Sequence, residues 1–302
     1  MHIPDGFLSN KMWLALDALS GASILYAARR LRLEASARIV PLMGVLSAFV
    51  FAAQLLNFPV LGGTSGHLVG GALLAILLGP LAGFLTMATV LIAQALFLQD
   101  GGLAALGANI FNIGAVTSFS GYGLFRLLAG SPPRERRLAW AGFVSGWASL
   151  VLSAVCCALE LGLSRAIPLE VGLPAMAGYH AIIGFAEGGL TAGVLVFLAR
   201  VRPDLIKGTS DLRMGLADWA VALGFVALPV LVLILAGSSA LPDPLERLLS
   251  SAGAMTEPRN DAGDLLSPDR YPEYLRAAAI LVVGTALVYL VARLVQGRSR
   301  KS

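Results

Sequence analysis

Long apolar runs with short polar connections are the feature of this sequence that most constrains its fold. A bilayer crossing needs about 20 mostly apolar residues. Of the 302 residues, 57% are hydrophobic and only 13% are charged, whereas an average soluble domain is about 25% charged. So few charged side chains could not cover a soluble globule of this size. We therefore expect a membrane protein, not a soluble enzyme.

The sequence predicts an all-α polytopic membrane protein with about nine transmembrane helices. The apolar runs cover approximately residues 11–28, 38–58, 66–79, 81–98, 103–129, 138–163, 174–201, 216–237 and 277–296. The third run is the shortest, and the Gly79-Pro80 turn after it predicts a tight hairpin with the fourth.

Most of the 22 Lys and Arg residues lie in four clusters, and each cluster follows an odd-numbered run. The clusters are Arg29, Arg30, Arg32 and Arg38; Arg126, Arg134, Arg136 and Arg137; Arg200, Arg202, Lys207 and Arg213; and Arg293, Arg298, Arg300 and Lys301. Basic residues are retained on the cytoplasmic side, so we expect the N-terminus outside and the C-terminus inside. The net charge of +4 then indicates topology and not binding to nucleic acid.

A polar break at 207–211 predicts two parts, residues 1–208 and residues 209–302. The second part has two runs joined by an outer loop, 238–275, which is rich in acidic residues. This loop is either a weak cation-attracting surface or simply a solvated connection. The first ten residues contain no basic stretch, so we expect no signal peptide and a mature chain that begins at Met1.

Histidine occurs at only three positions, His2, His67 and His180. His2 lies next to the α-amine, so the Met1 amine, the His2 amide nitrogen and the His2 imidazole could chelate one metal ion. A planar nitrogen field of this kind favours Ni(II) and Cu(II), followed by Co(II), whereas Zn(II) prefers tetrahedral sites. His67, in a Gly-rich segment, could supply a fourth nitrogen. Alternatively, His2 is an interfacial polar residue and His67 is a loop residue bonded to backbone.

Several other polar residues are candidates for supporting roles. His180 and Glu187 share a helix face, where they could relay protons, steady a neighbouring helix or support a site. Asn109 and Asn112 also share a face and could hold a loop over the site, while Asp17 and Glu160 are expected to bond between helices. The further candidates near the outer ends of the runs are Thr64, Ser65, Gln94, Gln99 and Asp100.

Three segments together closely resemble the CbiM/NikM family, the substrate-specificity components of cobalt or nickel energy-coupling factor transporters. The segments are Met1-His2-Ile3-Pro4-Asp5-Gly6-Phe7-Leu8, Gly63-Thr64-Ser65-Gly66-His67-Leu68, and Gln99-Asp100-Gly101-Gly102-Leu103 running into Gly107-Ala108-Asn109-Ile110-Phe111-Asn112. The resemblance covers about residues 1–205. It implies a seven-helix bundle with the N-terminal segment inserted into it. It also implies that Ni(II) or Co(II), as transported substrate, is held by the Met1 amine, the His2 amide and imidazole, and His67.

The C-terminal part resembles the two-helix extension fused to many such proteins, which carries the marker Pro-Asp-Gly-Leu-Glu. Here the corresponding residues are Pro242-Asp243-Pro244-Leu245-Glu246. Pro244 replaces the glycine and excludes a positive φ at this position, so the usual turn is not expected.

The resemblance also implies partners: a membrane coupling (T) subunit and two cytoplasmic ATPase subunits, in a bacterial or archaeal cytoplasmic membrane. The sequence contains no G-x-x-x-x-G-K-[ST] pattern, so we expect no ATP bound by this chain. An alternative function is a stand-alone metal or cation permease, or a channel, in which His180 and Glu187 line the pathway.

Overall fold

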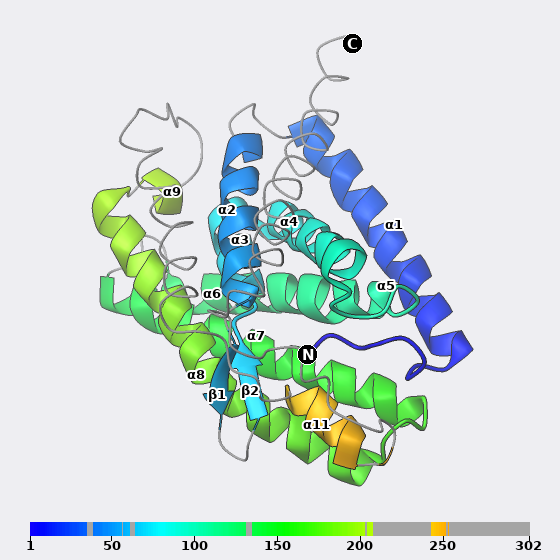
Figure 1. The fold of residues 1–302 in the computed structure, drawn as a ribbon. Helices are drawn as coiled ribbons and strands as arrows, with labels where there is room; N and C mark the ends of the chain where they lie inside the picture. The colour runs from blue at the N-terminus through cyan, green and yellow to red at the C-terminus, as the bar shows by residue number, and fades with distance from the viewer. Residues whose placement is uncertain are drawn as a thin grey trace, which may run out of the picture.

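The structure is a computed structural model, and the part of the chain that it describes is mostly helical (Figure 1). It describes residues 1–34, 39–55, 57–60, 64–130, 135–202, 204–207, 243–251 and 253. The two helices predicted at 216–237 and 277–296, and most of the predicted outer loop, lie outside these residues.

Helices occur in all seven runs predicted before residue 208. They are α1 (Asn10–Glu34), α2 (Ile39–Gln54), α3 (Gly71–Leu78), α4 (Pro80–Ala93), α5 (Leu106–Asn109), α6 (Thr117–Ala129), α7 (Glu135–Leu163) and α8 (Leu169–Val201), and the short α9 (Asp204–Lys207) follows the seventh run. Two π-helices, η1 (Gln94–Leu98) and η2 (Ile110–Val116), continue α4 and join α5 to α6, and α11 (Pro244–Ser251) follows in the C-terminal part.

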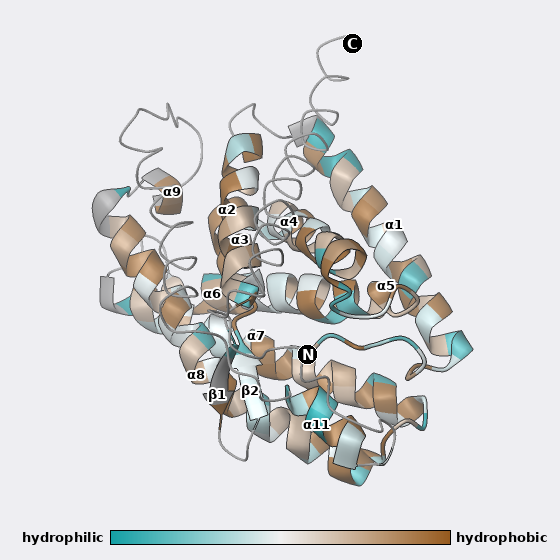
Figure 2. Ribbon diagram, in the orientation of Figure 1, coloured by the Kyte–Doolittle hydropathy of each residue, from teal (hydrophilic) through white to brown (hydrophobic). Residues whose placement is uncertain are grey.

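Three of the described helical segments are long and apolar enough to cross a membrane. They are Pro80–Leu98, Arg137–Leu163 and Leu169–Ala199, and the shorter α2 is also apolar. Figure 2 shows mostly hydrophobic or neutral positions along α7 and α8. These lengths and compositions are those of a membrane protein.

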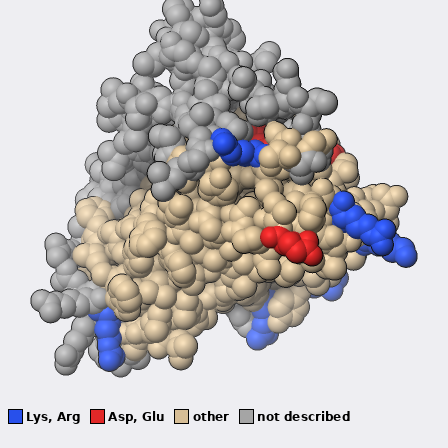
Figure 3. Space-filling model, turned by 90° about the horizontal axis from the view of Figure 1, so that it is seen from below, with Lys and Arg blue, Asp and Glu red and all other residues tan. Residues whose placement is uncertain are grey.

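The described surface is rich in large apolar side chains. Leu127 is 78% exposed and Trp140 is 64% exposed, and Figure 3 shows few acidic or basic side chains on the described part of one face. In water, a protein with such an apolar surface would be prone to association, whereas in a bilayer the lipid tails cover the surface.

A two-stranded hairpin departs from the predicted all-helical fold. Strands β1 (Asn57–Val60) and β2 (Thr64–His67) pair antiparallel, with Asn57 opposite His67. The expectation of a helix over 66–79 is therefore wrong at its start, because α3 begins only at Gly71. Two short segments that flank a Gly-Gly pair favour a hairpin. The hairpin places His67 at the end of a strand, just before α3.

The helices α3 and α4 pack closely, and this contact generates a test of the fold. A Cβ atom at Gly83 of α4 would lie 2.6 Å from the backbone nitrogen of Ala75 in α3, whereas Gly123 of α6 has open space around it. We expect Gly83→Ala to lower the free energy of unfolding by about 1–3 kcal/mol, as overpacking does. Gly123→Ala, the control, should leave stability unchanged or raise it slightly. Thermal unfolding of the two detergent-purified variants measures both changes in stability. Equal unfolding midpoints of Gly83→Ala and Gly123→Ala would contradict the α3–α4 packing.

Candidate metal-binding site

The first residues of the chain are buried inside the described helices. Met1 and Ile3 are almost completely buried, and the N-terminus lies near the middle of the molecule (Figure 1). The backbone of Ile3 makes two bonds with Asn109: its N–H donates to Oδ1 at 2.7 Å, and its carbonyl accepts from Nδ2 at 3.1 Å. The Gly102 N–H donates to the same carbonyl at 2.9 Å. Asn109 therefore holds the N-terminal segment in place.

Asp5 provides a second anchor for the N-terminal segment. Its carboxylate accepts hydrogen bonds from the backbone N–H groups of Leu103, Ala104 and Ala105, at 3.0, 2.8 and 3.1 Å. A Cβ atom at Gly102 would overlap Asp5, so only glycine allows this approach. Sequence reasoning missed this role of Asp5.

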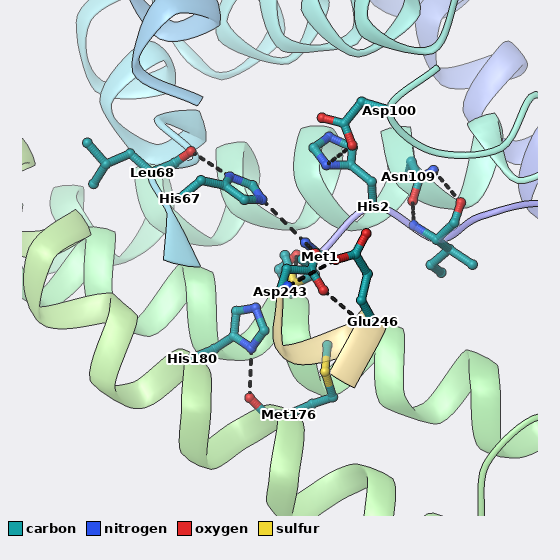
Figure 4. Close-up of polar contacts among 12 residues, drawn as sticks. Met1, His2, His67, Leu68, Asp100, Asn109, Met176, His180, Asp243 and Glu246 are labelled. Atoms are coloured by element: carbon teal, nitrogen blue, oxygen red, sulfur yellow. Dashed lines mark hydrogen bonds and ion pairs between the residues drawn. The ribbon is translucent and has the colours of Figure 1, made fainter. Parts of the chain in front are cut away.

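The α-amine of Met1 contacts two side chains from distant parts of the sequence (Figure 4). Its nitrogen lies 3.3 Å from Nε2 of His67 and 2.7 Å from Oδ2 of Asp243. Burial alone would lower the pKa of the amine, but the charge of Asp243 outweighs this effect and raises the pKa above its ordinary value. Burial alone would raise the pKa of Asp243, and the amine instead holds it well below its usual range.

His67 presents an unprotonated nitrogen to the amine. Its Nδ1 lies 3.0 Å from the carbonyl oxygen of Leu68, which can only accept, so the ring proton resides on Nδ1. Burial lowers the pKa of His67 to about 3, which keeps the ring neutral at neutral pH. A histidine that donates one ring N–H to a backbone carbonyl and offers the other nitrogen has the arrangement of a metal ligand.

His2 lies beside His67 but faces another partner. The two rings are stacked, with centroids 5.5 Å apart and planes inclined by 21°. Nδ1 of His2 lies 3.3 Å from Oδ1 of Asp100, and Nε2 is buried with no hydrogen-bond partner among the described residues. Burial lowers the pKa of His2, which favours the neutral ring. The imidazole would have to turn from Asp100 toward the amine to close the predicted chelate.

Glu187 and Gln94 support the strand-to-helix junction that follows His67. The two carboxylate oxygens of Glu187 accept from the backbone N–H groups of Val69, at 2.8 Å, and Gly70, at 2.7 Å. Gln94 donates to Gln54 at 2.7 Å, and Gln54 donates to the Val69 carbonyl at 2.7 Å. Glu187 directly, and Gln94 through Gln54, thus hold the backbone just after His67.

The remaining predicted residues lie farther from the amine or act locally. Asn112 donates to Glu160 at 2.6 Å and not to a loop, and His180 bonds Met176 of its own helix at 2.8 Å while its ring lies near Asp243 in Figure 4. Gln99 takes a left-handed conformation at the end of η1. Thr64 and Ser65 are buried in β2.

Side chains alone do not form a metal site here. Within the described ranges, no group of three or more His, Cys, Asp or Glu residues is arranged to hold an ion. The donors that converge are the Met1 amine, His67 Nε2 and, after rotation, the His2 ring. Any metal site at this point depends on the chain terminus.

The chain is similar to known transport proteins over most of its length. The sequence profile of the CbiM family, described as "Cobalt uptake substrate-specific transmembrane region", matches residues 2–205. The chain belongs to the CbiM family. A protein of Archaeoglobus fulgidus named "Putative fused nickel transport protein NikMN" is 39% identical over 276 residues, which cover 91% of this chain and 85% of that protein.

Two further comparisons each cover 71% of this chain. The cobalt transport protein CbiM of Sorangium cellulosum is 35% identical over 226 residues, 71% of this chain and 98% of that protein. A crystal structure of a transition metal transporter has a TM-score of 0.61 and 33% identity, and it covers 71% of this chain and all of that chain. The chain thus belongs to a family of cobalt and nickel transport proteins, and it is a transport protein rather than an enzyme.

The bonds between Asn109 and Ile3 generate a prediction. Asn109→Leu keeps a similar volume but removes both bonds, so the amide proton of Ile3 should exchange with solvent at least about tenfold faster, because lost hydrogen bonds favour local opening. Asn10→Ala, which removes only an exposed bond to Trp13, is the control. Hydrogen-exchange mass spectrometry of the N-terminal peptide measures the effect, and unchanged exchange in Asn109→Leu would refute the anchoring role.

Proposed function

We propose that this chain is the substrate-binding membrane component of an ATP-driven energy-coupling factor importer for a divalent transition metal, with nickel favoured over cobalt. The observation that carries the proposal is the separation of 3.3 Å between the Met1 nitrogen and His67 Nε2. Two nitrogen ligands at about 2.0 Å from one ion and at right angles are about 2.8 Å apart. A small movement would therefore let both bind the same ion.

The chemistry of the donors supports Ni(II). Met1 would give its amine after loss of a proton, His2 its deprotonated amide and its imidazole, and His67 its Nε2 lone pair. These four nitrogens form a planar field, the geometry that suits Ni(II). Asp100, which lies 3.3 Å from the His2 ring, would hold that ring until it turns to the metal.

The position of the site supports an importer that takes up the ion from the outside. The C-terminal end of α1 and the short α9, next to basic clusters in the sequence, lie on the upper side in Figure 1, away from the N-terminus. This separation supports a site that faces outward if basic residues are cytoplasmic. We assign ATP hydrolysis to two separate ATPase chains and energy coupling to a membrane T subunit, all in the cytoplasmic membrane.

The alternative, a permease that uses His180 and Glu187 as a pathway, has less support. Both oxygens of Glu187 accept backbone hydrogen bonds, and His180 bonds the backbone of Met176. Both residues thus serve the local structure, whereas a conducting pathway needs polar atoms that can take up a passing ion.

Blocking the amine tests the proposed site directly. A protein fused at its N-terminus to a domain that a protease removes without a trace should bind Ni(II) at least about a hundredfold more weakly before cleavage than after it, because a peptide bond removes the amine donor. The same preparation, measured before and after cleavage by titration with Ni(II), is its own control. Equal binding in both forms would exclude the amine as a ligand.

Competition between metals tests the preference. The purified chain, titrated with Ni(II) and Co(II) together and analysed by metal content, should retain mostly Ni(II), because the planar nitrogen field and the general order of metal affinities favour Ni(II) over Co(II). Preferential retention of Co(II) would contradict the planar site.

A further inference from the structure

A carboxylate from the C-terminal part of the chain reaches the amine of the first residue. Oδ2 of Asp243 lies 2.7 Å from the Met1 nitrogen, although 242 positions separate the two residues. The Asp243 side chain is 20% exposed and the Met1 side chain 1%. The contact is thus an ion pair in a largely desolvated place, where a charge without a partner would be costly.

Helix α11 fixes the orientation of the Asp243 carboxylate. Oδ1 of Asp243 accepts from the Glu246 N–H at 2.8 Å, and Oε2 of Glu246 accepts from the Asp243 N–H at 3.1 Å. These reciprocal bonds form a capping box, and Pro244 occupies the first helical position, which suits proline. One oxygen of Asp243 therefore caps the helix, and the other is directed at the amine.

The helix itself is anchored beside the site. Leu245 and Leu249 are completely buried, and α11 packs against α8 and β2, the strand that ends at His67. Figure 4 shows Asp243 and Glu246 next to Met1, with His67 on the other side of the amine. The position of the carboxylate is thus fixed relative to both candidate metal donors.

We propose that Asp243 is a positioning residue for metal capture, which holds the Met1 amine and balances its charge before and after the metal binds. This inference rests on the proposed function. When the ion arrives, the amine and the His2 amide each lose one proton to solvent and each forms a bond to the metal. The bound amine keeps two N–H bonds, and one of them donates to Oδ2.

The positive charge that faces Asp243 is the same before and after the metal binds. An ammonium group carries one positive charge. A divalent ion bound to one deprotonated amide also carries one net positive charge, because the amide contributes one negative charge. A fixed carboxylate can thus remain in place throughout, and the C-terminal part of the chain prepares the site without binding the metal.

Three substitutions in the full-length protein test this role, with Ni(II) affinity measured by competition against a chromophoric chelator. Asp243→Asn keeps an effective helix cap but removes the charge. Asp243→Asn should weaken Ni(II) binding about 10–100-fold, because the Met1 amine loses the charged partner that holds it in position, and loss of a partner that orients a metal ligand has an effect of this size. Glu246→Gln preserves the capping box but removes a charge in the same turn. Its Ni(II) affinity should lie within about threefold of that of the wild type.

Asp243→Glu separates positioning from capping. Glutamate keeps the charge but is a poor helix cap, so positioning predicts tighter Ni(II) binding by Asp243→Glu than by Asp243→Asn. A purely structural role predicts the reverse order. If Asp243→Asn fails to fold, Asp243→Glu is compared with the wild type instead: positioning by the charge predicts Ni(II) binding within about tenfold of the wild type, and a larger loss would contradict it.

Two results would overturn the inference. One is wild-type affinity in Asp243→Asn, which would leave the contact as a docking site for α11 alone. The other is a changed visible absorption spectrum of its nickel-saturated form, which would make Asp243 a direct ligand. Failure of the proposed function looks different, because the wild-type protein itself would then bind neither Ni(II) nor Co(II).

Discussion

The burial of the chain's own N-terminus is the constraint on which the rest of the site depends. A charged amine in an apolar environment is unfavourable unless an opposite charge and hydrogen bonds compensate for lost water. Here Asp243 supplies the charge, while Asn109, Gly102 and Asp5 hold the following backbone. These contacts fix the amine opposite His67. Without them, the amine would not be held beside His67, and the proposed donor set would be lost.

The polar residues of this apolar chain mostly work through backbone groups. Glu187 orders the segment after His67 by accepting two backbone N–H groups, and Asp17 accepts the N–H of Gly107, which joins α1 to α5. In a bilayer, each backbone group outside regular structure needs a partner within the protein. The irregular segments around the site meet this requirement with a few acidic and amide side chains, and their positions are thereby fixed.

Sequence patterns predicted the helices of residues 1–208 well, because apolar runs of bilayer length carry a strong signal. They also pointed to Met1, His2 and His67, since histidine is rare and position 2 adjoins the amine. The strands β1 and β2 were missed because each has only four residues and overlaps one end of an apolar run that predicted a helix. The contact of Asp243 with Met1 was missed because no local pattern encodes pairing across 242 positions. Pro244, expected to disturb a turn, instead begins α11.

We propose that a divalent metal binds the Met1 amine, the His2 amide and imidazole, and His67 in one plane. X-ray absorption at the nickel edge, recorded on the nickel-loaded full-length protein, tests it most directly. We predict a four-coordinate shell of nitrogen atoms with the pre-edge feature of planar nickel. A sulfur atom in the shell, or six-coordinate nickel surrounded mainly by oxygen, would contradict the claim.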